Sequence, residues 1–294
     1  MNSIKPIHAG IFFALITAIG LGSITTQAKV FYAGDGNAMT LMLTRFLIST
    51  LVFGLLIVGK RRTFKIDRHQ YRPVIMLGLI WSGSMICYLL SVELISVSLA
   101  VLVLYTYPLL VLIYAVFRRQ ISPSPILISV FCLAFVGLYL ALSRGSVKLD
   151  STGLLFASLA GLGAAYTFIR GARVAPHINP LVMTFWINAV GLVMILPLVA
   201  TQFSLPTAIT ALTALAAATL FYVIAILCQF EALARLPATT AAFILNLEPV
   251  VSIVLAAMIL QEQLTAIQWV GVALVVFVLL FAIRITARGS PATR

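Results

Sequence analysis

The feature that most constrains this chain is a series of apolar runs that follow one another with little polar interruption. A helix needs about 20 apolar residues to cross a membrane, and the chain holds enough of them for roughly ten crossings. Only 9% of the 294 residues are charged, against roughly 25% in ordinary globular domains, which is too few to cover a soluble surface. Because backbone exposed to lipid must satisfy its own hydrogen bonds, the sequence predicts an all-α, polytopic membrane protein.

Proline, glycine and charged residues divide these runs into ten predicted membrane-spanning helices. Their approximate ranges are 8–30, 38–59, 73–93, 97–117, 124–143, 151–171, 180–200, 208–230, 238–260 and 265–284. The first follows Lys5 and resembles a signal peptide, but no convincing cleavage site comes after it, so we interpret it as a retained helix. Cys87, Cys132 and Cys228 lie in apolar runs without paired spacing, which indicates buried thiols and neither disulfides nor a metal cluster.

The positive charges predict the orientation of these helices, because cytoplasmic loops of membrane proteins are rich in Lys and Arg. With the N-terminus in the cytoplasm, 15 basic residues fall in cytoplasmic segments, three fall outside (Lys29, Arg144 and Lys148), and Arg45 lies within a crossing. The net charge of +12 would also suit a nucleic-acid-binding protein, but these residues lie between apolar runs and form no stripe on a domain. We therefore predict two cytoplasmic termini and no nucleic-acid partner.

An internal repeat divides the chain into predicted halves at 1–146 and 147–294. A shift of 141 residues superposes Cys87 on Cys228, Ala100 on Ala241, Pro108 on Pro249 and Ala115 on Ala256. A shift of 143 residues superposes two ladders of small residues, Ala14, Ala18 and Gly22 on Ala157, Gly161 and Ala165. Five crossings per half is an odd number, so the halves are predicted to run through the membrane in opposite directions, as in many secondary transporters. Small-residue ladders also serve ordinary helix packing.

The second half carries the residues of a family resemblance. Its motifs are Leu236-Pro237-Ala238, then Glu248-Pro249, then Glu262-Gln263-Leu264. This pattern resembles the EamA family of the drug/metabolite transporter superfamily, and the likeness extends to ten crossings arranged as five plus five. The first half departs from the pattern, with Tyr107-Pro108 in place of Glu-Pro and Ile121 in place of the later glutamate. Its tyrosines resemble the branch that exports aromatic and other apolar amino acids.

Pro108 and Pro249 lie near the middle of the fourth and ninth predicted crossings. Each removes a backbone donor, which frees the carbonyl of Leu104 or Leu245 and bends the helix. Matched bends flanked by polar side chains indicate a central binding site, although proline is also tolerated in membrane helices without a function. Between these bends, the sequence predicts a midplane cavity.

Glu248 is the only acidic residue near the centre of a predicted crossing. A carboxylate at that depth is costly, so it must face protein or water, or be protonated. It can couple transport to protons, bind a substrate amine, or cap the bent backbone. Arg45 lies about one and a half turns inside its crossing, where snorkelling to the outer interface is favoured over recognition of a substrate carboxylate.

Aromatic and amide side chains at similar depth complete the candidate site. The predicted substrate-binding residues are Tyr88, Tyr105, Tyr107, Tyr166, Trp186, Asn188, Asn246 and Glu248. Residues two apart on a straight helix point about 200° away from each other, so Tyr105 and Tyr107 line one wall only if Pro108 distorts the turn. Any one aromatic can also be a packing residue, as can Trp81, which lies equally deep in its crossing.

The resemblance implies a secondary transporter of the bacterial inner membrane that exports apolar and aromatic amino acids by alternating access, with a small-molecule substrate and lipid as its partners. The alternative is a broad drug or metabolite exporter coupled to protons through Glu248. An enzyme is not expected, because an intramembrane active site would need several titratable groups at one depth. No cofactor or metal is expected: His8, His69 and His177 lie at loops or helix ends, and no Walker-type loop is present.

Overall fold

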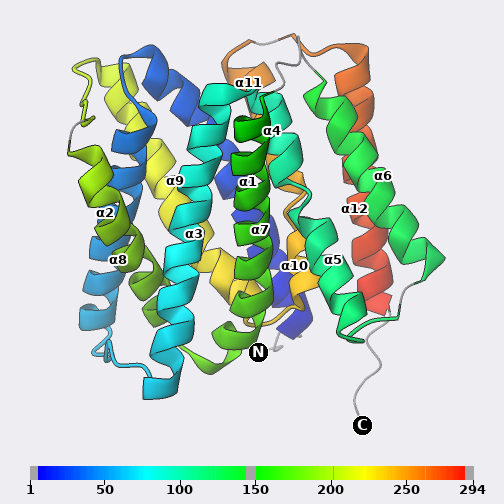
Figure 1. Ribbon diagram of the computed structural model, residues 1–294, viewed down its shortest axis with the longest axis horizontal. Helices are drawn as coiled ribbons and strands as arrows, with labels where there is room; N and C mark the ends of the chain where they lie inside the picture. Colours follow the sequence, from blue (N-terminus) through cyan, green and yellow to red (C-terminus); the bar gives the residue numbers. More distant parts are fainter. Residues whose placement is uncertain (1–5, 123, 144–149, 201, 262, 289–294) are drawn as a thin grey trace, which may run out of the picture.

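The computed structural model describes residues 6–122, 124–143, 150–200, 202–261 and 263–288, which form a bundle of upright helices (Figure 1). The elements are α1 (Pro6–Ala33), α2 (Ala38–Gly59), α3 (Arg68–Leu94), α4 (Val97–Leu104), α5 (Tyr107–Phe117), α6 (Pro125–Leu142), α7 (Ser151–Val174), η1 (Ala175–His177), α8 (Pro180–Val199), α9 (Ile209–Leu233), α10 (Ala238–Ile244), α11 (Leu247–Ile259) and α12 (Ala266–Arg288). Within the described ranges, nine helical spans are long and apolar enough to cross a membrane, and the apolar part of α12 adds a shorter one.

Two of these spans differ from the single helices that the sequence predicts. The fourth consists of α4 followed by α5, and the ninth consists of α10 followed by α11. The third helix also begins earlier than its apolar run, at Arg68, because a helix continues past the apolar part of its sequence into the polar boundary region. Pro73 is thereby included in the first turns of α3.

Polar side chains at the short connections fix where several helices begin. The Asn37 side chain accepts a hydrogen bond from the Thr40 amide at 2.8 Å, and Asp150 accepts one from the Gly153 amide at 2.8 Å. Ser96, Ser124 and Asn179 cap α4, α6 and α8 in the same way. Each cap satisfies one of the free amides of a first helical turn, so the connections can stay short.

The centre of the bundle is formed by α1, α3, α7 and α9, with α2 and α8 on one side and α6 and α12 on the other (Figure 1). The central helices pack in two pairs, α1 on α9 and α3 on α7. Small residues allow both contacts. A Cβ on Gly20 would lie 2.9 Å from Ala225 Cβ, and a Cβ on Gly163 would lie 2.9 Å from Ser84 Cβ. The backbones therefore approach as closely as helices in lipid require.

The first helix of each half, α1 and α7, starts at the opposite end of this bundle from the other. Asp67 and His69, where α3 begins, line one pocket with Arg170 and Arg173, where α7 ends. Short connections join α1 to α2 and α2 to α3, so α1 starts at the end where α7 finishes. In Figure 1 this is the lower end, and the described part of α12 also finishes there.

Candidate functional site

Two helix breaks lie side by side within the bundle. In the fourth span, α4 ends at Leu104 and α5 begins at Tyr107; in the ninth, α10 ends at Ile244 and α11 begins at Leu247. The α10 helix packs against α5, so the broken spans of the two halves are in contact. Helix ends at this depth expose backbone groups that a continuous helix would use internally. Irregular backbone at membrane depth is found where protein or a water-filled space surrounds it.

The two prolines lie in the first turn of the second helix of each pair. Proline suits that position, because the first turn of a helix leaves its amides without helical partners. The expectation of a free Leu245 carbonyl is wrong, because the Glu248 amide donates to it at 2.9 Å. The Leu104 carbonyl faces α7, where a Cβ on Gly161 would lie 3.2 Å from it.

The small-residue ladders lie against these breaks. Gly161 of α7 faces the carbonyl end of α4, and Gly22 of α1 faces α11 so closely that a Cβ would lie 2.5 Å from the Glu248 carbonyl oxygen. Ala14 and Ala18, on the same ladder of α1, are fully buried. A larger side chain at Gly22 would displace α11, so these residues determine how close the whole helix comes to the break.

The electrostatic neighbours of Glu248 are tyrosines of the other half of the chain. They are Tyr88, Tyr105 and Tyr107. The Tyr105 and Tyr107 rings lie 5.7 Å apart, and Tyr107 packs on Phe168 at 5.1 Å. Because these neighbours come from α3 and the α4–α5 break, Glu248 faces the space between the halves. We call Tyr88, Tyr105, Tyr107 and Glu248 the tyrosine–glutamate cluster.

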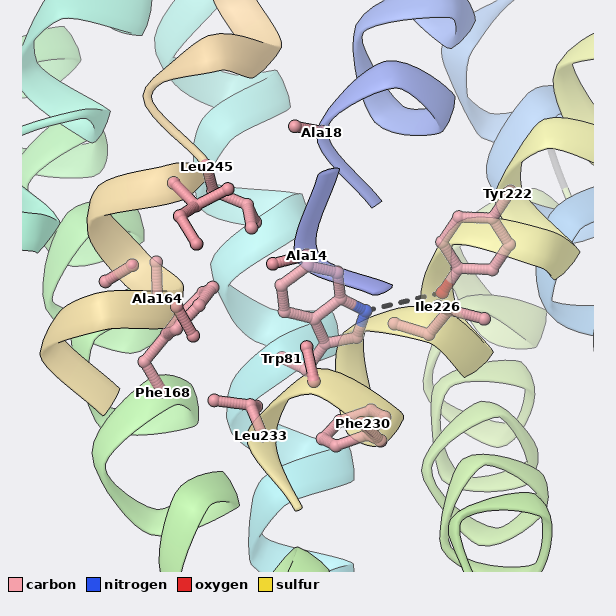
Figure 2. Close-up of a cluster of buried hydrophobic side chains, with 14 of the residues drawn as sticks. Ala14, Ala18, Trp81, Ala164, Phe168, Tyr222, Ile226, Phe230, Leu233 and Leu245 are labelled. Atoms are coloured by element: carbon pink, nitrogen blue, oxygen red, sulfur yellow. Dashed lines mark hydrogen bonds between the residues drawn. The ribbon is translucent and has the colours of Figure 1, made fainter. Parts of the chain in front are cut away.

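A second contact between the halves joins α3 to α9. Figure 2 shows Trp81 reaching Tyr222, whose hydroxyl accepts a hydrogen bond from the indole Nε1 at 3.3 Å. Both side chains are buried among apolar residues that include Ala14 and Phe168. The two residues are 141 positions apart, the same shift that superposes the halves of the sequence. Among the described residues, no group of three or more His, Cys, Asp or Glu side chains could hold a metal ion.

Comparison with known proteins assigns the chain to a family. The sequence matches the EamA-like transporter family twice, over residues 8–143 and again over residues 151–284. The chain belongs to the EamA-like transporter family. The predicted division at 1–146 and 147–294 falls between the two matched ranges.

The fold of this EamA-like transporter is also found in a solved crystal structure. The two share 18% sequence identity, with a TM-score of 0.76, and the match covers 94% of this chain and 99% of the other. At this identity the likeness concerns the fold alone. No curated protein matches the EamA-like transporter significantly. Members of the family are transporters and not enzymes.

Other predicted site residues of the EamA-like transporter lie outside the tyrosine–glutamate cluster. Asn246 is buried within the α10–α11 break, two residues before Glu248. Tyr166 of α7 is half-buried and packs against the apolar core. The Glu-x-Leu motif of the family resemblance begins at Glu262, which lies outside the described residues.

Trp186 and Asn188 are occupied by other contacts. The Trp186 indole donates to the Phe64 carbonyl at 2.9 Å and its ring packs on Tyr71, which attaches α8 to the α2–α3 connection. The Asn188 amide donates to Thr184 one turn earlier on α8 at 2.8 Å, while its Oδ1 is buried without a partner among the described residues. Trp186 was predicted to contact substrate because of its depth along the predicted crossing. In the structure its indole contacts the segment that connects α2 and α3.

Tyr222 and Phe168 of the EamA-like transporter were missed in the sequence. The Tyr107 ring packs on the Phe168 ring, and the Tyr222 hydroxyl accepts a hydrogen bond from the Trp81 indole. The repeat contained a signal for Tyr222, because a shift of 141 residues from Trp81 arrives at it. No comparable signal identified Phe168, since one aromatic residue in an apolar helix is typical of packing.

Proposed function

We propose that this chain exports amino acids with apolar or aromatic side chains, by alternating access of a site between its halves. The observation that carries the proposal is the tyrosine–glutamate cluster, in which a carboxylate of the second half has three phenol groups of the first half as electrostatic neighbours. Phenol rings provide flat apolar walls with a polar edge, which suits a substrate that has an apolar side chain and charged ends. The Glu248 carboxylate would bind the substrate ammonium group.

Alternating access on this proposal arises from two halves with inverted topology. Each family match covers five spans, and α1 and α7 start at opposite ends of the bundle. The hydrogen bond between Trp81 and Tyr222 gives further support, because a residue can touch its own repeat equivalent only near the axis that relates the halves. The two broken spans would then exchange roles as the halves rock around this axis.

The orientation proposed is cytoplasmic for both termini, in the inner membrane of a bacterium. Basic residues support it: Arg61, Arg62 and Lys65 line a pocket at the end of the bundle where Arg170 and Arg173 also lie. Cytoplasmic loops carry such an excess of positive charge. Substrate would therefore enter from this end and leave at the end where α11 finishes.

The proposed function is tested by transport into proteoliposomes across a panel of amino acids and cationic drugs, with and without a pH gradient. We expect transport of apolar and aromatic amino acids, with a loss of at least tenfold in Tyr105→Ala or Tyr107→Ala. Tyr139→Ala is the matched control, because Tyr139 lies on α6 with its ring exposed on the outer surface of the bundle. Unchanged transport by both cluster variants would remove the site assignment.

Proton-coupled export of drugs or metabolites is the second candidate, and Glu248 is the observation that favours it. Its carboxylate is the one acidic side chain near the middle of a span in the described part of the chain. The same assay separates the two functions. Cationic drug transport that requires a pH gradient and disappears in Glu248→Gln, without amino-acid transport, would establish the second function in place of the first.

A further inference from the structure

Arg45 packs on an aromatic ring of another helix. It lies on α2 about 10 Å from the outer end of that helix, and its guanidinium carbon is 5.0 Å from the centre of the Tyr222 ring. Tyr222 lies near the middle of α9, about 20 Å from the outer start of the helix. A cation over an aromatic face is stabilised by the ring, more so where water is excluded.

The ring beneath Arg45 is held in a fixed position. Trp81 donates its indole hydrogen bond to the Tyr222 hydroxyl, and the Phe46 ring meets the Tyr222 ring edge-on at 6.1 Å. These contacts come from α3 and α2, so three helices set the place of one phenol ring. The guanidinium consequently has a rigid platform on one side, as a specific ligand site requires.

The guanidinium is partly buried and has no ion-pair partner among the described residues. Its Nε is buried with no hydrogen-bond acceptor among the described residues, and no carboxylate of the described residues forms an ion pair with it. Its electrostatic neighbours are the phenols of Tyr32 and Tyr222. An unpaired charge inside a protein is costly, so this arrangement indicates that an anion completes the site.

Other unpartnered polar atoms lie on the helices around Arg45. They are Ser49 Oγ on α2, Ser82 Oγ on α3 and Asn188 Oδ1 on α8. These side chains are fully buried, and α8 packs on both α2 and α3. Gly191 marks that contact, because a Cβ there would lie 2.6 Å from Ser82 Oγ and 2.8 Å from Phe46. Buried polar groups without partners are rare and typical of sites that await a ligand or water.

Tyrosines connect Arg45 to the tyrosine–glutamate cluster. Tyr32, at the outer end of α1, is an electrostatic neighbour of both Arg45 and Tyr88. Tyr88 is in turn a neighbour of Glu248. These neighbours form a series of phenol groups that leads from Arg45 to Glu248. A zwitterion has the complementary pair of charges.

We propose that Arg45, supported on the Tyr222 ring, binds the carboxylate group of the transported substrate. The inference rests on the proposed amino-acid export and deepens it, by giving the substrate carboxylate a residue on the outer side of the site. Arginine suits this role because its planar fork matches the two carboxylate oxygens. On this proposal Arg45 recognises the carboxylate of the substrate, and Glu248 recognises its ammonium group.

The test compares binding of L-phenylalanine, 3-phenylpropionate and phenethylamine to the purified wild-type protein and to Arg45→Gln. Phenylpropionate has the carboxylate without the amine, and phenethylamine has the amine without the carboxylate. We expect Arg45→Gln to weaken phenylalanine and phenylpropionate by at least tenfold and to leave phenethylamine within twofold. Equal weakening of all three ligands, or none for phenylalanine, would overturn the proposal.

Arg173→Gln is the matched control for the loss of a cation–ring pair. Arg173 lies 5.4 Å from the Tyr114 ring and also donates a hydrogen bond to the Tyr114 hydroxyl, but it does so at the basic end of the bundle. The Arg173→Gln variant should bind all three ligands as the wild type does. A chloride titration distinguishes carboxylate recognition from general anion binding: phenylpropionate binding that 0.1 M chloride displaces completely would contradict the proposal.

A fluorescence measurement on the wild-type protein tests the Arg45 site even if the Arg45→Gln variant misfolds. Binding at Arg45 should change the emission of Trp81, because Trp81 is hydrogen-bonded to the ring that supports the guanidinium. Phenylpropionate should therefore change the tryptophan fluorescence of the wild type, and Trp81→Phe should lose that change. A change that persists in Trp81→Phe would refute the location. If the wild type binds phenylpropionate at Arg45 but transports no amino acid, the export proposal fails and the carboxylate site stands.

Discussion

At the residue scale, Glu248 is the side chain whose charge the proposed function needs. Glu248→Gln keeps the size of the side chain and its capacity for hydrogen bonds with Tyr105, but removes the charge. A hydrogen bond to a charged group contributes about 1.5–3 kcal/mol, so we expect the apparent affinity for an amino acid to fall by roughly 10-fold to 100-fold. Transport kinetics in proteoliposomes measure this directly.

Glu231→Gln is the control for that substitution. Glu231, in the last turn of α9, forms an ion pair with Arg235, which lies just beyond the end of the helix, and both side chains are partly exposed. Exposed pairs of this kind contribute about 0–1 kcal/mol, so its transport should match the wild type within about twofold. Equal losses in Glu248→Gln and Glu231→Gln would show a general effect of charge and would count against the site.

Gly22 allows a second prediction about a single residue. Gly22→Ala would bring a Cβ to 2.5 Å from the Glu248 carbonyl oxygen and 2.8 Å from Val251 Cβ, so α11 must shift. Overpacking of this kind costs about 1–3 kcal/mol, and we expect a lower melting temperature in detergent together with reduced transport.

Gly83→Ala is the comparison for Gly22→Ala. A Cβ at Gly83 of α3 would meet nothing within 4 Å, and alanine is favoured over glycine within a helix by about 1 kcal/mol. Its melting temperature should stay unchanged or rise. A fall equal to that of Gly22→Ala would show that packing against α11 is not the cause.

At the scale of helices, the breaks before Pro108 and Pro249 decide what the site can be. Pro249→Ala restores a backbone donor, which permits α10 and α11 to join. We expect transport to fall several-fold while the melting temperature is maintained, because the substitution favours a continuous helix. Pro73→Ala is the control: Pro73 lies near the start of α3, away from both breaks. Wild-type transport by Pro249→Ala would show that the break is not needed.

The sequence predicted the helices well and the contacts of single side chains poorly, for a physical reason. Apolar runs and caps are local, so the bounds of spans such as 38–59 and 180–200 agree with the structure to within a residue. The relation of Tyr105 to Tyr107 is different, because it depends on a gap of two residues between helices. Straight-helix geometry allowed the two rings to share a wall only if Pro108 distorted the turn, and in the structure, where the helix is broken there, their centres lie 5.7 Å apart.

Trp186 and Arg45 also show that the contacts of a single side chain cannot be predicted from its position along a helix. Depth along a helix gives the level of a residue in the membrane, but rotation of the helix decides what the side chain meets. Trp186 meets the Phe64 carbonyl of a connecting segment, and Arg45 meets Tyr222 of α9. Neither partner is close in sequence, so neither contact could be predicted from local pattern.

At the scale of the whole molecule, the main contacts between helices of the two halves occur in pairs that correspond under the internal repeat. The pairs α1–α9 and α3–α7 exchange when the halves are exchanged, and so do the ladders that face the two breaks. Trp81 and Tyr222 meet where such an exchange leaves position unchanged. A rocking motion about this line would move both breaks together, which is the property that transport through a central site requires.

Opposite orientation of the halves is tested by thiol accessibility of repeat-related positions. Phe117 ends α5 and Met258 lies near the end of α11, 141 residues later, with 83% and 67% of their surfaces exposed. In a background with Cys87, Cys132 and Cys228 replaced, we expect a membrane-impermeant maleimide to label Met258→Cys in intact cells. Phe117→Cys should be labelled only after the cells are opened, because the proposed orientation places it at the cytoplasmic end. Ala33→Cys, at the outer end of α1, should react like Met258→Cys; labelling of Phe117→Cys and Ala33→Cys from the same face would contradict inverted halves.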